Sequence, residues 1–142
     1  MVSNAETFQA KTDELIFSFV EAVNNQNITK IVMALSENTL FCNSQGKEIV
    51  GKENVIRAWM NYFELFPDYY IEVDHIIENE HTIGILGYSG GTYKKSVNDL
   101  DKWRLPSAWK VKLNKREIAQ WQVYTDNMIP FEIIKRNMNG KG

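Results

Sequence analysis

The chain has 142 residues and a formal net charge of −2, and 44% of its residues are hydrophobic. This length predicts one domain over residues 1–142, with its core at about residues 8–137. A chain of this size buries roughly two thirds of its unfolded surface, so it needs neither a metal nor a disulfide to fold. Cys42 is the only cysteine, which excludes an internal disulfide and a cysteine-based zinc cluster.

Targeting and nucleic-acid signals are also missing from the sequence. No basic N-terminal stretch leads into an apolar segment, and the apolar runs are shorter than the roughly 20 residues of a membrane helix. Acidic and basic residues are interspersed rather than gathered on a basic face. We therefore expect a cytoplasmic protein that binds neither nucleic acid nor a membrane.

Helical periodicity marks the first half of the chain. A first helix is predicted by apolar residues that recur at helical spacing, namely Phe8, Leu15, Phe19, Ala22 and Val23. Asn27 is placed to cap a second, shorter helix. A third helix is predicted from about Lys52 to Phe66, where Pro67 ends it.

Alternation with a period of two replaces this pattern after Tyr69. Strands are predicted at residues 71–77, 82–93, 107–113 and 118–126, with a short earlier one at 39–43, a polar loop at 94–104 and a final helix at 131–136. In the first of the later strands one face carries Ile71, Val73, His75 and Ile77. The glycines of the returning strand predict a bend, a bulge or a close approach of another group. Helices followed by an antiparallel meander define an α+β fold, in which a curved sheet wraps around the N-terminal helices and forms a conical pocket.

Four segments in this order resemble the SnoaL-like family of the nuclear transport factor two-like superfamily, with its cystatin-like fold. They are residues 20–25 (VEAVNN), 49–53 (IVGKE) leading into Trp59 and Phe63, 66–68 (FPD) and 121–127 (WQVYTDN). The resemblance extends from about Leu15 to Ile134. It implies a cone-shaped pocket for a small, mostly apolar molecule and no metal or organic cofactor. Members of the family include polyketide cyclases, isomerases and epoxide hydrolases, and others only bind or assemble, so the fold alone does not define an activity.

Asp126 is the first candidate for a catalytic residue, because it resembles the acidic group that SnoaL-like cyclases carry at the end of this strand. Alternation places Asp126 on one face with Tyr124 and Gln122, and we predict that this face lines the cavity. An apolar wall would raise the pKa of the carboxyl group and suit it to acid/base catalysis. Alternatively, Asp126 caps the following turn or lies at the solvated rim.

His75 is the second catalytic candidate, since its intrinsic pKa lies near neutrality. The alternative is a histidine satisfied in the core or an interface. Nothing in the sequence shows that His75 and Asp126 share a cavity. No metal site is predicted, because the two histidines have no supporting carboxylate cluster.

Ligand-binding candidates are polar or aromatic residues near the predicted pocket, and each has a simpler role in the core or in a turn. They are Tyr124, Asn43, Trp59, Tyr62, Phe63, Tyr88, Trp103 and Trp109.

Two better-known mechanisms of the superfamily are not transferable. Ketosteroid isomerase has a tyrosine in its first helix where this chain has Phe17 and Phe19, and the Arg-x-Asp step of limonene epoxide hydrolase is missing here. The favoured interpretation is a cofactor-free cyclase or isomerase-like enzyme that transfers protons on a small apolar or cyclic substrate. The alternatives are a non-catalytic ligand-binding module and a protein-interaction domain.

A homodimer that pairs through the sheet is predicted separately. With Asp126 facing inward, Trp121, Val123 and Thr125 would form an apolar outer face, and exposed patches of this kind usually contact a partner.

Overall fold

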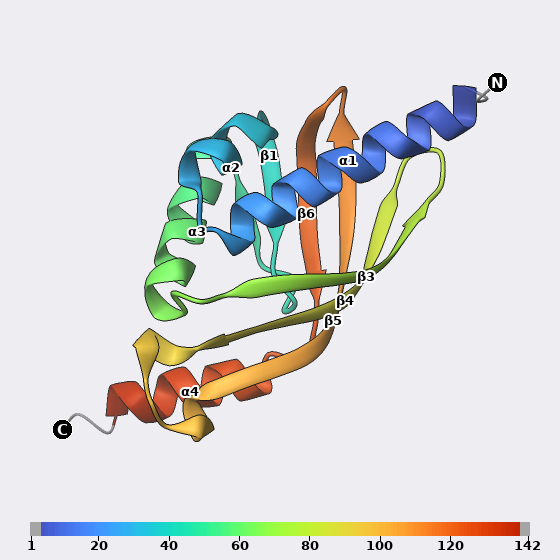
Figure 1. The fold of residues 1–142 in the computed structure, drawn as a ribbon. Coiled ribbons are helices and arrows are strands. Elements are labelled where there is room, and N and C mark those ends of the chain that lie inside the picture. Colours follow the sequence, from blue (N-terminus) through green and yellow to red (C-terminus); the bar gives the residue numbers. More distant parts are fainter. Residues whose placement is uncertain (1–3, 140–142) are drawn as a thin grey trace.

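The structure, a computed structural model, describes residues 4–139, with side chains from residue 11 onward except that of Lys95. The side chain of Phe8, the predicted start of the buried stripe, lies outside this part. In chain order the elements are α1 (Asn4–Asn24), α2 (Ile28–Ala34), β1 (Leu35–Cys42), β2 (Glu48–Val50), α3 (Lys52–Leu65), β3 (Tyr70–Glu78), β4 (Ile83–Thr92), the short 3-10 helices η1 (Tyr93–Lys95) and η2 (Asp99–Asp101), β5 (Lys102–Asn114), β6 (Glu117–Tyr124) and α4 (Met128–Asn139) (Figure 1).

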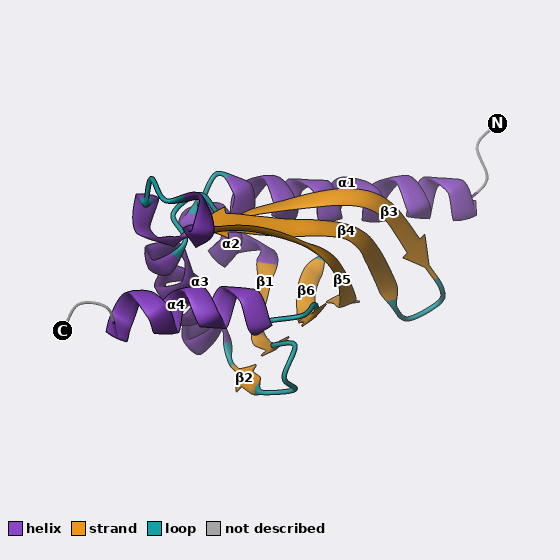
Figure 2. Ribbon diagram, turned by 90° about the horizontal axis from the view of Figure 1, so that it is seen from below, coloured by secondary structure: helices purple, strands orange, loops and turns teal. Residues whose placement is uncertain are grey.

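The sheet is curved and has the strand order β2-β1-β6-β5-β4-β3 (Figures 1 and 2). The predicted α+β class with its curved sheet is confirmed. Two features differ from the prediction: β2 is an additional strand, and β1 pairs with β6 in parallel. The parallel pair places Phe41 beside Trp121, so the early strand joins the meander through its last member.

Side-chain hydrogen bonds fix the ends of the N-terminal helices. The Oδ1 atom of Asn27 accepts a hydrogen bond from the N–H of Lys30, which confirms the predicted cap of α2. Asn24 ends α1 and binds both backbone groups of Ile71, accepting from its N–H at 2.7 Å and donating to its carbonyl at 3.0 Å. The end of α1 is therefore attached to the start of β3.

A β-bulge in β3 reverses the face on which the following side chains lie. Val73 pairs with Gly87 and His75 with Leu86, so Asp74 is the extra residue. Past the bulge, Ile77 is 59% exposed, although Ile71 is buried. The prediction that His75 and Ile77 share a face with Ile71 is wrong, because one inserted residue shifts a period-two pattern to the opposite face.

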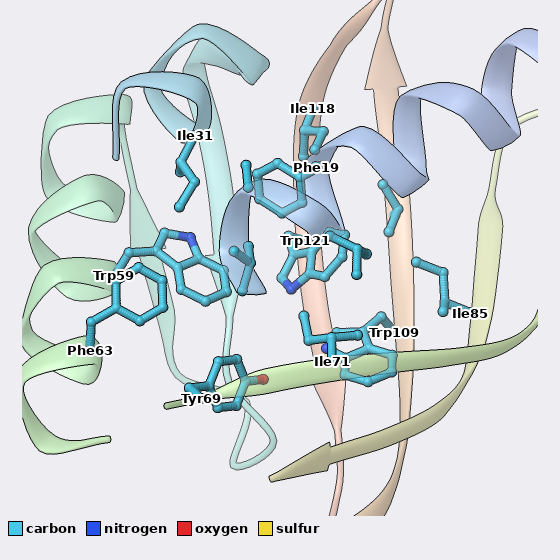
Figure 3. Packing of buried hydrophobic residues seen from close by; sticks show 14 of the residues in the cluster. Phe19, Ile31, Trp59, Phe63, Tyr69, Ile71, Ile85, Trp109, Ile118 and Trp121 are labelled. Carbon is cyan, nitrogen blue, oxygen red and sulfur yellow. The ribbon is translucent and has the colours of Figure 1, made fainter. Parts of the chain in front are cut away.

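The core fills the space between α1, α3 and the concave side of the sheet. Figure 3 shows Phe19 of α1 above Trp121 of β6, with their ring centroids 4.8 Å apart. Trp59 of α3 lies beside Phe63 and faces the same space. The ring centroid of Trp109 of β5 lies 6.3 Å from that of Trp121. Aromatic side chains therefore extend from the helices to the sheet.

A buried carboxylate attaches α4 to the segment before β5. Asp101 is 4% exposed, and its Oδ2 accepts a hydrogen bond from the Ser96 hydroxyl at 2.7 Å. Its Oδ1 accepts from the side chains of Arg136 and Asn137, both on α4. Segment 94–104, predicted as a loop, thus contains η2 and the first residues of β5, and it holds α4 in place.

Candidate functional site: an aromatic cavity without charged walls

A cavity of about 250 Å³ lies between α3, α4 and the concave face of the sheet. Its walls are mainly aromatic and aliphatic, with a few hydroxyl and amide groups. The lining residues are Phe41, Asn43, Ile49, Ala58, Trp59, Tyr62, Tyr69, Ser89, Trp103, Trp109, Trp121, Val123, Thr125, Asn127, Pro130, Phe131 and Ile134. This volume is slightly below the roughly 300–1,000 Å³ of typical ligand pockets and suits a compact ligand of one or two rings.

Strand β6 presents to the cavity the face opposite to the predicted one. Trp121, Val123 and Thr125 line the cavity, and Trp121 is only 2% exposed. Tyr124, on the other face, is 46% exposed. The predicted alternation is therefore correct, but the prediction that Tyr124 and Asp126 face inward is wrong. Burial of the apolar face of β6 against α1 and α3 determines the orientation.

Asp126 lies outside the cavity at the start of α4. It is exposed, and its Oδ1 accepts a hydrogen bond from the N–H of Met128, two residues further on, at 3.0 Å, which is an Asx-turn contact. With Ser44 and Gln45 it borders a separate open hollow on the surface. His75 is exposed on β3 and does not line this hollow or the cavity. The structure therefore does not bring the two catalytic candidates together.

Five of the eight predicted ligand-binding residues line the cavity: Asn43, Trp59, Tyr62, Trp103 and Trp109. The other three, Tyr124, Phe63 and Tyr88, do not. Phe63 packs against Trp59 in the core. Tyr88 lies on the outer side of the sheet, where the Cζ atom of Arg104 is 3.8 Å from the centroid of the Tyr88 ring.

Asn43 lies at the turn between β1 and β2. Its Oδ1 accepts hydrogen bonds from the N–H groups of Gln45 and Lys47, each at 2.9 Å. The side-chain oxygen is therefore occupied by the turn, as the alternative interpretation of Asn43 proposed.

A chain of hydroxyl groups crosses the sheet side of the cavity. Ser89 lines the cavity, as Tyr69 does, and the Oγ of Ser89 is 2.7 Å from the Oγ of Ser107. The Ser107 hydroxyl lies 3.1 Å from the Oγ1 of Thr125, and Thr125 donates to the carbonyl of Pro106 at 3.0 Å. We call these three residues, Ser89, Ser107 and Thr125, the hydroxyl chain. The sequence does not reveal it, because only the strand register brings together residues from three different segments.

Burial keeps both cavity tyrosines protonated. Desolvation raises the pKa of Tyr69 far above its ordinary value, more than the hydrogen bond from Ser89 lowers it. Desolvation also raises the pKa of Tyr62, and the neighbouring Tyr69 adds to the effect. Among the lining residues that the structure describes, none is Asp, Glu, Lys, Arg or His. The described part of the cavity wall is thus uncharged at neutral pH.

The chain belongs to the SnoaL-like domain family, whose model matches residues 16–127. Solved structures with the same fold include a proposed SnoaL-like polyketide cyclase from Jannaschia sp. CCS1, with a TM-score of 0.75 at 11% identity, covering 88% of this chain and 92% of that one. The structure of an LEH-like epoxide hydrolase of M. tuberculosis matches with a TM-score of 0.73 at 12% identity, and the match covers 91% of this chain and 92% of that one. A protein of Catenulispora acidiphila with a ketosteroid isomerase-like fold, solved in complex with trimethylamine, matches with a TM-score of 0.69 at 14% identity. This match covers 78% of this chain and 84% of that one.

These similarities define the fold and leave the activity open. A comparison with curated protein sequences finds no match. Within residues 4–139, no helix is both long and apolar enough to cross a membrane.

Proposed function

We propose that the protein binds a small, mostly apolar ring compound in the aromatic cavity. The observation that carries this proposal is a cavity walled by Trp59, Trp109 and Trp121, without a charged side chain among its described lining residues. Aromatic walls favour flat, apolar ligands, and burying a charge there without a partner is costly. Binding without conversion, one of the alternatives that the sequence left open, fits this site better than proton transfer.

Proton transfer by Asp126 has no geometric support, because its carboxylate accepts a hydrogen bond in the turn before α4 and does not line the cavity. An acid/base residue must come within hydrogen-bond reach of the ligand, directly or through one water molecule. His75 is exposed on another strand and does not line the cavity. The homodimer remains a prediction, but Trp121, Val123 and Thr125 cannot form its interface while they line the cavity.

Filling the cavity tests the proposal. Ala58 lines it from α3, and Ala58→Phe would place a ring in the ligand space. We expect naphthalene to bind the wild-type protein in equilibrium dialysis and to raise its melting temperature, and Ala58→Phe to reduce the affinity at least tenfold. The control is Met60→Phe, at an exposed position on the same helix, and it should leave binding unchanged. Absence of binding to the wild-type protein would refute the proposed function.

Affinity for naphthalene should be independent of pH between about pH 5 and pH 9. Ionisation of the cavity tyrosines is displaced to higher pH by burial, and the described walls hold no other titratable side chain. Asp126→Asn should likewise leave the affinity within about twofold of wild type. Dialysis at several pH values measures both effects. A pH-dependent step in affinity that His75→Gln removes would instead link His75 to binding.

A further inference from the structure

The wall between the cavity and solvent is thinnest at the start of α4. Of the lining residues that the structure describes, Phe131 alone is exposed, at 44%, and the others are buried or half-buried. Phe131 also lines the open surface hollow beside Asp126, and so do Thr125 and Asn127. These three residues therefore separate the ligand space from the hollow.

One rim of the hollow is the turn between β1 and β2, which contributes Ser44 and Gln45. This turn is held by several hydrogen bonds. The backbone N–H of Asn43 donates to the carbonyl of Lys47, and its carbonyl accepts from the N–H of Gly46. The side chain of Asn43 accepts from two further N–H groups of the turn. This rim cannot move without breaking several hydrogen bonds at once, so it is the fixed side.

The opposite rim is the first turn of α4, and it is held more loosely. Met128, Ile129 and Phe131 are 63%, 44% and 44% exposed, and Pro130 is the buried member of this turn. The hydrogen bond that the N–H of Met128 donates goes to Asp126 and so stays within the segment. A segment with few buried apolar contacts opens at a lower free-energy cost than the core does.

The second half of α4 is attached to the rest of the molecule. Arg136 donates to the carbonyl of Leu100 at 2.9 Å and binds the buried carboxylate of Asp101, to which Asn137 also donates. Ile133 is 2% exposed. Figure 1 shows α4 at the end of the molecule opposite to α1. The helix is therefore fixed at its C-terminal half, and its first turn is the part that can move.

We propose that ligands enter and leave the aromatic cavity between the β1–β2 turn and the first turn of α4, and that the ring of Phe131 is the gate. The ring turns outward into the hollow and lets a flat ligand pass. The inference rests on the proposed function and adds the route to its site. A gate of this kind limits the rate of association, because only the open fraction of the protein admits a ligand.

Fluorine NMR with 2-fluoronaphthalene tests the inference on the full chain. The free and bound signals give the affinity, and the exchange between them gives the dissociation rate, so the association rate follows from the two. Phe131→Ala removes the gate and should raise the association rate about fivefold or more, since the step that precedes entry is no longer needed. Phe131→Trp enlarges the gate and should lower the association and dissociation rates together.

Ile134→Ala is the matched control, because Ile134 lines the cavity one turn further along α4 but does not border the hollow. It loses a ligand contact and should raise only the dissociation rate. The gate would be refuted if Phe131→Ala left the association rate unchanged, or if Ile134→Ala raised that rate equally; either result leaves the proposed function standing. Absence of a bound signal with the wild-type protein would overturn both.

Discussion

Replacing Gly87 with alanine is expected to lower the free energy of unfolding by roughly 3 kcal/mol, at the upper end of the usual cost of overpacking. A Cβ atom at Gly87 would lie 1.8 Å from the backbone oxygen of Glu72, where the bulge of β3 brings the two strands together. Backbone cannot move aside as a flexible side chain can, so the sheet must distort. Urea denaturation of the wild-type and variant proteins measures the difference.

Gly84→Ala is the control for this prediction. Gly84 also lies in β4, but a Cβ there would be 3.7 Å from its nearest neighbour, the carbonyl oxygen of Ile77, which is an ordinary contact. We expect this variant to retain nearly all of the wild-type stability. Similar losses for both variants would show that glycine is required throughout β4 for a reason other than the bulge.

Replacing Asp101 with asparagine is expected to reduce stability at neutral pH by roughly 2–3 kcal/mol. Removing one partner of a buried ion pair costs about 3–5 kcal/mol, and a smaller loss is expected here because the side chain of Arg136 is 48% exposed. Asp99→Asn, an exposed position in the same short helix, should change stability by less than about 0.5 kcal/mol.

The pH dependence of this difference checks its cause. The hydrogen bond from Ser96 contributes most to lowering the pKa of Asp101, followed by that from Asn137, and Arg136 also lowers it. A carboxyl group whose pKa is lower in the folded state stabilises the protein above its unfolded pKa of about 3.9, and this contribution is lost as the pH falls through the folded value. The stabilities of wild type and Asp101→Asn should therefore converge in acid. If the difference in unfolding free energy between the two proteins stayed constant down to about pH 2, the loss would come from the changed shape of the side chain and not from its charge.

The α+β fold could be predicted from the sequence because periodicity and composition are local properties. The stripe of α1, the cap at Asn27 and the alternation of β6 all lie within short segments. The orientation of β6 was also within reach. Trp121 and Val123 are apolar while Gln120 and Gln122, which alternate with them, are polar, and this contrast indicates the buried face better than the acidic residue at the end of the strand.

Other parts of the site depend on the strand register, which single segments do not reveal. No residue of β3 itself indicates the bulge at Asp74. Gly87, which lies opposite the bulge, is one of several glycines in β4. The contact between Ser89 and Ser107 is a product of the pairing of β4 with β5. Asp101 lies in a polar segment, and its burial depends on α4, which begins well after it in the chain.

The parallel pairing of β1 with β6 bears on the order in which the molecule folds. Phe41 and Trp121, neighbours in the sheet, are separated by most of the chain, so this pair closes a long loop at a considerable entropic cost. The β3–β6 meander can form from contacts between consecutive strands, but β1 has no place in the sheet until β6 is available. We therefore expect the cavity wall that joins these two strands to form late in refolding, after the hairpins of the meander.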